Sequence, residues 1–311
     1  MVIAVVGASG FVGLELVKKL VDSGNQIRVL SRNELYPIKG VTVFRLDLTH
    51  EHSDFGDFLD GVDILYNCSG VISDESLMWD LHVTAMERLV QLSRGRVKRW
   101  VQLGSVGSYG RFLNGDVTEE FDDHPVGLYE ETKTISDNIV KNSDIPYVIL
   151  RPSNIFGLSM SNQSLFELLR AIRLGVFFHI GRKDSIVNYI WIDDVVSALI
   201  KCGVDRSALG NTFNISQSIK TNSMVWSLQK GLGIKGNFLR FPEVFVRRIA
   251  QIARMVYKPF PLTESRIDAL TGHCVYNSQK IVDILGFEFG KDLEGRFYDF
   301  SLDAAQSYEK K

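Results

Sequence analysis

The sequence predicts an α/β fold in which a doubly wound parallel sheet is accompanied by a smaller C-terminal substrate lobe. Two observations support this prediction. Residues 2–6, VIAVV, form an apolar run directly before a glycine-rich turn and an amphipathic stretch, and such a run is typical of a parallel strand buried on both faces. Strand-like runs then alternate with helix-like segments through residues 26–217, which is the pattern of β-α-β units.

The composition is that of an ordinary globular protein. The chain has 311 residues, of which 45% are hydrophobic and 23% charged, with a net charge of -2, so bulk electrostatic binding to nucleic acid is not expected. Cys68, Cys202 and Cys274 lie far apart, and the six histidines form no ligand-like cluster; we therefore expect reduced thiols and no metal site. Residues 1–11 lack the features of a signal peptide, and no apolar run is long enough to span a bilayer, so the expected location is cytoplasmic.

The first functional motif is the turn GASGFVG, in which Gly7, Gly10 and Gly13 separate a strand from a helix. Gly7 permits a tight turn, Gly10 lets the backbone approach a pyrophosphate, and Gly13 lets helix and strand pack closely. The diphosphate would lie at the helix N-terminus, where unpaired N–H groups favour an anion. This is the fingerprint of a Rossmann-type dinucleotide site, and the helix is expected to end at Gly24. The predicted contacts are Gly7, Ser9, Gly10, Phe11, Val12 and Gly13.

The G-x-x-G-x-x-G spacing resembles the extended branch of the short-chain dehydrogenase/reductase superfamily, which includes nucleotide-sugar epimerases, dehydratases and ketoreductases. Two further elements carry the same resemblance, Arg-Pro-x-Asn-x-x-Gly at residues 151–157 and a Lys-x-x-x-x-Leu-Gly-Phe element at residues 280–287. The resemblance therefore covers nearly all of the chain. It implies an NAD(P)-dependent enzyme of the epimerase/dehydratase family.

The end of the second strand bears on the choice of cofactor. Residues 26–30 lead into Ser31 and Arg32, and an arginine at this position accommodates the 2′-phosphate of NADP, whereas an acid would bind the 2′-OH of NAD. Arg32 therefore favours NADP(H). Glu34 lies close by in the sequence and keeps NAD(H) open.

Other cofactor contacts follow from the resemblance. Asp47 and Leu48 follow the third strand, where the family binds adenine, although Asp47 could instead cap the next helix. Small residues beside the cofactor are expected at Cys68, Ser69 and Gly70, because backbone must touch the ribose. Lys133, Pro152 and Asn154 complete the implied set.

The segment YEETK places Tyr129 and Lys133 one helical turn apart and hence on one face. Ser105 precedes Tyr129 at the spacing seen in the family, so the resemblance implies a Ser105–Tyr129–Lys133 catalytic triad. The chemistry fits these residue types. A phenol with a pKa of about 10 is a poor base at neutral pH, and an adjacent ammonium and a positive nicotinamide would lower that pKa. Ser105 would hold the substrate oxygen beside the phenol.

Two departures from the family pattern affect the reaction. His82 stands where the family usually has asparagine; it is either a substrate contact whose protonation adds a pH dependence or a buried, satisfied histidine. The acid pair of dehydratases is replaced by Val106 and Gly107, which argues against dehydration.

The second half of the sequence predicts the remaining architecture. Asp193 and Asp194 follow a strand and are expected to cap the next helix, and residues 210–216 are expected to form the last strand of the sheet. Residues 1–157 with 186–217 would form the NAD(P)-binding domain. Residues 158–185 with 218–311 would form the substrate-binding lobe.

The substrate carrier depends on two features of the lobe. Val187 replaces the arginine that often grips a nucleotide diphosphate, a role that Arg182, Lys183 or Arg266 could take. Residues 242–262 form a basic amphipathic segment with arginines 247, 248 and 254 and Lys258, which resembles the corresponding region of enzymes acting on steroids and polyprenyl-linked sugars. Such a helix can lie on an anionic membrane, but burial of its stripe, Val244, Phe245, Ile249, Ile252 and Val256, is the commoner outcome and is expected here.

These observations predict an NADP(H)-preferring oxidoreductase that reduces a nucleotide-carried keto-sugar at C4 in carbohydrate biosynthesis. The alternatives are a sugar 4-epimerase acting on a nucleotide- or polyprenyl-diphosphate-linked hexose, and a cofactor-binding scaffold without turnover. Arg32 favours the reductase, because an epimerase recycles its bound cofactor. The expected partner is a small-molecule sugar, with peripheral membrane contact through residues 242–257 and a homodimer both left open.

Overall fold

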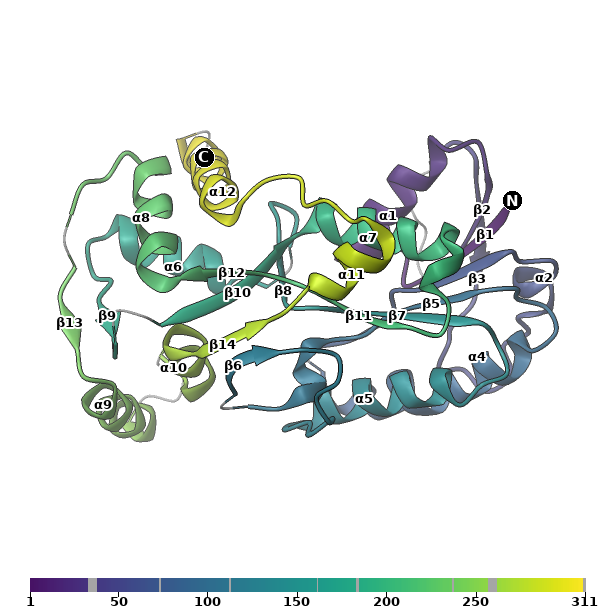
Figure 1. The fold of residues 1–311 in the computed structure, drawn as a ribbon, viewed down its shortest axis with the longest axis horizontal. Coiled ribbons are helices and arrows are strands. Elements are labelled where there is room, and N and C mark those ends of the chain that lie inside the picture. The colour runs from purple at the N-terminus through teal and green to yellow at the C-terminus, as the bar shows by residue number, and fades with distance from the viewer. Residues whose placement is uncertain are drawn as a thin grey trace.

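A computed structural model describes residues 1–32, 38–72, 74–111, 113–160, 162–182, 185–236, 238–256 and 262–309. Its centre is a seven-stranded parallel sheet in the order β11-β7-β5-β4-β1-β2-β3 (Figure 1). The strands are β1 (Val2–Val6), β2 (Gln26–Ser31), β3 (Val41–Arg45), β4 (Ile64–Asn67), β5 (Trp100–Leu103), β7 (Tyr147–Pro152) and β11 (Thr212–Ile215). The predicted doubly wound parallel sheet is confirmed.

Both faces of this sheet are buried, as the apolar runs predicted. In β1, Ile3 and Val5 join the core beneath α1 (Phe11–Val21) and α7 (Ile192–Val204), whereas Ala4 and Val6 join the core beneath α4 (Ala85–Ser93). This alternation is the period of two that a strand imposes on its side chains. Figure 1 shows α1, α7 and α11 (Gln279–Leu285) above the sheet, and α2 (Gly56–Leu59), α4 and α5 (Leu128–Lys141) below it.

The substrate lobe is built around a three-stranded sheet of β8 (Asn154–Phe156), β10 (Ile186–Trp191) and β12 (Gln217–Lys220). Helices α6 (Ser164–Arg173), α8 (Thr221–Gly231) and α12 (Leu293–Glu309) accompany it. An aromatic cluster packs these helices on the sheet, and in it the rings of Phe156 and Phe297 are stacked with their centroids 4.7 Å apart. Strand β10 thus pairs outside the central sheet, although residues 186–217 are predicted to belong with the first domain.

The outermost part of the lobe is small. Strands β9 (His179–Ile180) and β13 (Arg240–Phe241) pair with each other, and helices α9 (Glu243–Val256) and α10 (Glu264–Thr271) lie next to them (Figure 1). Strands β6 (Asn114–Val117) and β14 (His273–Tyr276) form a further pair that ties the lobe to the first half of the chain. None of the described helices is both long and apolar enough to cross a bilayer.

Two predicted helix ends differ from the structure. Helix α1 ends at Val21, and Gly24 instead occupies the left-handed region, with φ of 71°, in the turn to β2. Asp193 and Asp194 do not cap α7, because the helix already begins at Ile192. They lie in its first turn, where Asp193 accepts a hydrogen bond from Trp191 Nε1 and Asp194 accepts one from the Gly290 amide. Both carboxylates still oppose the positive end of the helix.

Candidate active site

The glycine turn packs tightly at the carboxyl edge of the sheet. Gly7 has φ of 74°, and a Cβ there would lie 2.6 Å from the backbone of Cys68 and Ser69. A Cβ on Gly13 would lie 2.2 Å from the carbonyl oxygen of Gly7, so the tight turn and the close helix packing both require glycine. Ser9 and Gly10 are exposed at the tip, Phe11 is half-buried, and Val12 is buried. The approach of a pyrophosphate to Gly10 remains a prediction.

The residues expected to select the cofactor gather at the neighbouring strand ends. Ser31 is buried at the end of β2, and Arg32 is exposed directly after it. Asp47 accepts hydrogen bonds from the amide and hydroxyl of Thr49. Burial works to raise the pKa of Asp47, but these bonds and the nearby Arg32 guanidinium outweigh it and lower the pKa. Leu48 is buried beside them, whereas Glu34 lies outside the described residues.

A buried amide network, which the sequence analysis missed, positions the loop after β4. The Asn67 side-chain oxygen accepts hydrogen bonds from the amide and hydroxyl of Ser69, at 3.1 and 2.6 Å. The Asn67 amide donates to Gln102, and Gln102 donates to Ser136 on α5. The network therefore links the Cys68-Ser69-Gly70 loop to the helix that carries Tyr129. Its signal in the sequence is a pair of polar side chains, Asn67 and Gln102, inside apolar strand runs.

The predicted triad lies on two adjacent elements. Ser105 caps the 3-10 helix Val106–Tyr109, and its Oγ accepts the Gly107 amide at 3.0 Å, which leaves its own proton available for donation. Tyr129 and Lys133 lie one turn apart on α5, as predicted. The Thr134 hydroxyl donates to Ser108 Oγ at 2.9 Å, and a Cβ on Gly107 would lie 2.9 Å from the Glu130 side chain. The Ser105 loop therefore packs directly on the start of the tyrosine helix.

The electrostatics of Tyr129 differ from the expectation. Burial, followed by the charges of Glu130 and Asp137, raises its pKa to about 12. Lys133 is buried, its Nζ donates to the Leu103 carbonyl at 2.7 Å, and burial lowers its own pKa. The lysine therefore does not by itself produce the predicted lowering of the pKa of the phenol. Tyr129 is protonated at neutral pH in this form, so it can donate a proton to a substrate oxygen.

His82 corresponds to the buried alternative and not to the pH-sensitive contact. It is 2% exposed, its Nε2 accepts the Val71 amide at 3.0 Å, and its Nδ1 lies 2.8 Å from the Thr132 hydroxyl. Since Nε2 accepts, Nδ1 carries the proton and donates it to Thr132. Burial, with the nearby Lys133 charge, lowers the pKa of His82 to about 3. The ring is therefore neutral, and it joins the loop after β4 to the residue before Lys133.

A second buried network, also missed, surrounds the first residue of the Arg-Pro-x-Asn element. Arg151 donates from Nε to Asp137 at 3.1 Å and from both terminal nitrogens to Asp123 at 2.6 and 2.9 Å. Asp137 lies one turn after Lys133 on α5, and Arg151 is only 2% exposed. Pro152 is buried at the end of β7, and exposed Asn154 donates to the Asn188 carbonyl. Bidentate pairing of this kind fixes the geometry beneath the triad.

The lobe residues considered for binding a diphosphate do not share one environment. Val187 is buried in the lobe core opposite Ile219. Arg266 forms an ion pair with Glu167 at 2.5 Å. Arg182 is exposed, and Lys183 lies outside the described residues.

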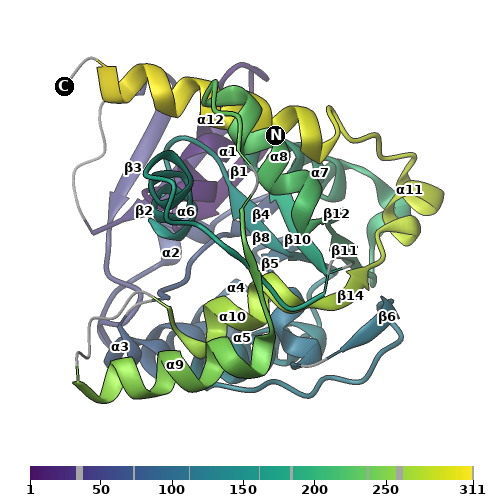
Figure 2. The ribbon, with the colours of Figure 1, turned by 90° about the vertical axis from the view of Figure 1, so that its left-hand side faces the viewer.

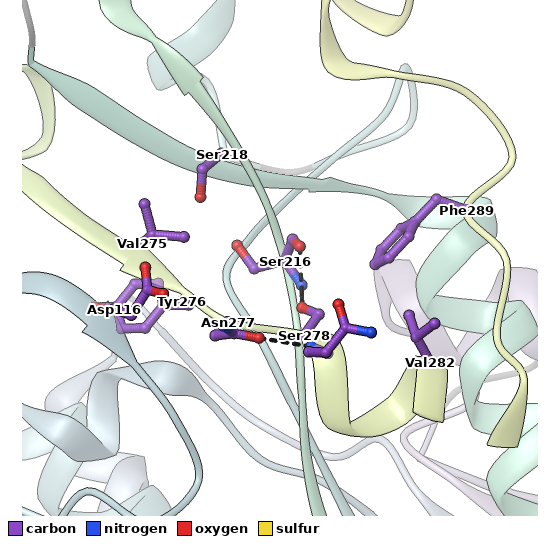
Figure 3. Close-up of a pocket in the computed structure, with 10 residues that line it drawn as sticks. Asp116, Ser216, Ser218, Val275, Tyr276, Asn277, Ser278, Val282 and Phe289 are labelled. Carbon is purple, nitrogen blue, oxygen red and sulfur yellow. Dashed lines mark hydrogen bonds between the residues drawn. The ribbon is translucent and has the colours of Figure 1, made fainter. Parts of the chain in front are cut away.

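A hollow of about 300 Å³ lies elsewhere, at the junction of β12, β14 and α11 (Figure 3). Its lining includes Ser216, Ser278 and Gln279, and it contains none of the three triad residues. The Ser278 hydroxyl accepts the Ser216 amide and donates to the Ser216 carbonyl. These polar groups therefore attach α11 to the end of β11.

Comparisons with known proteins agree with this geometry. The sequence model described as "NAD dependent epimerase/dehydratase family" matches residues 3–216. Mouse sterol-4-alpha-carboxylate 3-dehydrogenase, decarboxylating, is 24% identical over 230 residues, covering 68% of this chain and 63% of that protein. The chain thus spans less than two thirds of that relative. The dTDP-6-deoxy-L-talose 4-dehydrogenase (NAD(P)(+)) of Kitasatospora kifunensis is 26% identical over 227 residues, covering 66% of this chain and 71% of that protein.

A solved structure shares the fold. The UDP-glucuronic acid 4-epimerase of Bacillus cereus in complex with NAD superposes with a TM-score of 0.76. The two sequences are 16% identical, and the match covers 99% of each chain.

Proposed function

Because the chain belongs to the NAD dependent epimerase/dehydratase family, we propose that it is an NAD(P)-dependent oxidoreductase that reduces a ring ketone to a secondary alcohol. The observation that supports this chemistry is the packing of the Ser105 loop on the start of α5, the helix that carries Tyr129 and, one turn later, Lys133. A reductase needs an acid at the carbonyl oxygen, whereas an alcohol oxidation needs the phenolate.

The residues at the edge of the sheet fit a dinucleotide. Gly7 and Gly13 pack so closely on the Cys68–Ser69 backbone and on the Gly7 carbonyl that an added Cβ would overlap them, and this tight turn leads into the start of α1, where an anion is favoured. Arg32 beside Asp47 would receive a 2′-phosphate, so NADP(H) is the preferred cofactor and NAD(H) the second choice. The dinucleotide, when bound, supplies the hydride.

The protein's part of the chemistry is to move one proton. The Tyr129 hydroxyl would give its proton to the oxygen of the ketone as this becomes an alcohol, and the Ser105 hydroxyl would hold the same oxygen in place. Lys133 uses one of its three donors on Leu103, which leaves two for a ribose or for the phenol. The Asp137–Arg151–Asp123 network would keep α5 in position.

For the substrate we favour a lipidic molecule that bears the ketone on a ring. Such a molecule is either a sterol or a sugar linked to a polyprenyl chain. Val187 is buried where an arginine would grip a nucleotide diphosphate, and Arg266 is paired with Glu167. The similarity to the mouse sterol dehydrogenase supports this choice. The second candidate is the nucleotide-linked C4 keto-sugar, supported by the similarity to the dTDP-sugar dehydrogenase.

The test is NADPH oxidation with paired panels of sterol ketones, lipid-linked keto-sugars and dTDP- or UDP-linked 4-keto-sugars. Tyr129→Phe should slow turnover roughly 100- to 10,000-fold, the usual worth of general acid catalysis, with NADPH affinity retained. Tyr298→Phe, a half-buried lobe tyrosine on α12, is the matched control. Cofactor binding without turnover on any panel would identify a non-catalytic scaffold, and turnover of free nucleotide sugars alone would favour the second candidate.

A further inference from the structure

Helix α9 exposes nearly all of its large apolar side chains. These lie between 46% and 87% exposed, and they are Val244, Phe245, Ile249, Ile252, Met255 and Val256. At about 100° per residue, the six fall within about 140° of one another on the helix surface. We call this face the α9 arc. Burial of the stripe was expected, and that expectation is wrong.

The opposite face explains why the arc is left outside. Only Val246 and Ala250 of α9 are buried, in a small core with Ile180 of β9 and Ile267 of α10. Both are smaller than leucine, and the two-stranded β9–β13 sheet behind them is narrow. This small core therefore covers only the narrow face of α9 that carries Val246 and Ala250, and it leaves the α9 arc uncovered.

One arginine fixes the rotation of α9. Arg247 donates to Glu243 at 2.8 Å on its own helix, and to Glu264 at 2.6 Å and Asp268 at 2.7 Å on α10. It therefore lies toward α10 and not on the outer face with Arg248. The Arg247 charge offsets one of the three carboxylate charges, and the contacts hold the arc outward.

The charge that remains on the outer face is positive. Arg248 is exposed and lies inside the α9 arc, between the directions of Met255 and Ile252, and Arg254 is exposed near the α10 flank. Among the described residues of the helix, the arc contains no carboxylate. A long arginine inside an apolar face can bury its methylene groups in an apolar phase while its guanidinium reaches anions at the phase boundary.

Helix α9 lies toward the same side of the molecule as the helix that carries Tyr129 (Figure 1 and Figure 2). Figure 2 shows α9 and α3 (Glu75–Trp79) along the same edge of the molecule, with α5 behind them. Helix α3 packs against α5 and exposes Leu77 and Trp79. Helix α9 of the lobe and the α3–α5 pair that includes the helix of Tyr129 therefore lie toward the same side of the molecule (Figure 1 and Figure 2).

We propose that the α9 arc docks on an anionic lipid bilayer, lying parallel to its surface with the apolar side chains among the upper acyl chains. Arg248 and Arg254 bind the headgroup phosphates. An apolar arc interrupted by an arginine, with the acids of α9 and α10 gathered around Arg247 and outside the arc, complements such a boundary better than it complements a dry protein interface. The proposal deepens the proposed function, because it would present the active-site edge to a lipid-borne substrate.

The experiment measures binding of the full chain to vesicles without substrate, so its result is independent of turnover. Wild-type protein should sediment with phosphatidylcholine–phosphatidylglycerol vesicles and much less with phosphatidylcholine alone. Ile252→Ser with Val256→Ser should abolish sedimentation. Arg248→Glu with Arg254→Glu should weaken it by at least roughly five-fold per arginine, the usual contribution of a basic residue near an anionic surface.

Control variants are Val204→Ser, at an exposed valine at the end of α7, and Arg94→Glu, at an exposed arginine after α4; both should bind vesicles like the wild type. NADPH affinity should be unchanged in every variant, which shows that each folds. Failure of the wild type to sediment, or equal sedimentation with both vesicle types, would overturn the proposal. So would ultracentrifugation in which the serine variant turns a dimer into a monomer while vesicle binding persists, because the arc would then join two copies of the chain.

Discussion

Helices α1 and α9 are both amphipathic, yet the molecule uses them in opposite ways. Helix α1 buries Val12, Leu16, Val17 and Leu20 against the seven-stranded sheet. Helix α9 is longer, with 14 residues against 11, but buries only Val246 and Ala250. The difference lies in the surface behind each helix and not in the helix itself. A fully buried valine or leucine contributes about 1.5–3 kcal/mol, so the six side chains of the α9 arc leave a large free energy unused unless something covers them.

The strongest test of this comparison is the stability of one substitution in each helix. Gly13→Ala in α1 should lower the free energy of unfolding by several kcal/mol or prevent folding, because its Cβ would lie 2.2 Å from the Gly7 carbonyl oxygen. Ile252→Ser in α9 should change it by no more than about 0.5 kcal/mol. Urea unfolding followed by circular dichroism measures both. A comparable loss in the two variants would show that the α9 arc is already covered by the protein.

A second, smaller effect concerns the pH dependence of stability. His82 has a folded pKa of about 3, below its ordinary unfolded value near 6.5, so the unfolded chain binds the extra proton between these values. Stability contributed by neutral His82 is therefore complete above about pH 6.5 and is lost as the pH falls toward 3. The expected loss between pH 7 and pH 5 is about 2 kcal/mol.

His82→Asn should remove this part of the pH slope, whereas His50→Asn, at an exposed residue, should leave it in place. The measurement is urea unfolding at several pH values. A slope that is the same in the wild type and in His82→Asn would show that the buried ring does not control acid stability. The loss of stability in acid would then have to come from another titratable residue, such as a histidine of the lobe.

The smallest expected effect is on cofactor affinity, and it should arise from Arg32 after β2 and not from an arginine of the lobe. Arg32→Ala should weaken NADPH binding roughly ten-fold, the worth of a hydrogen bond to a charged group, and leave NADH binding unchanged. Arg182→Ala, an exposed arginine of the lobe, should leave both affinities as they are. Fluorescence titration of the two cofactors decides this. Equal affinities in wild type and Arg32→Ala would remove the main reason for preferring NADP(H).

Local patterns were sufficient to predict the first half of the molecule. The glycine spacing, the strand ends and the Tyr129–Lys133 turn depend on residues within a few positions of one another. The buried networks of Asn67 with Gln102 and of Arg151 with Asp123 and Asp137 join residues 14 to 35 positions apart, and no periodicity in the sequence indicates them. The exposure of the α9 arc could not be predicted for a related reason, since an amphipathic pattern says that a face is apolar but not which surface lies opposite it.

The close packing of Gly107 against Glu130 has a consequence for redesign of the site. Dehydratases that resemble this chain carry an acid pair where Val106 and Gly107 stand, so a designer would be tempted to install one there. Any side chain at residue 107 would begin 2.9 Å from the Glu130 Cγ and 3.2 Å from Ser105 Oγ. Dehydratase chemistry therefore cannot be grafted onto this scaffold by exchanging the pair alone. Glu130 would have to be replaced by a smaller side chain first, and loss of its charge would remove one of the two charges that, after burial, raise the pKa of Tyr129.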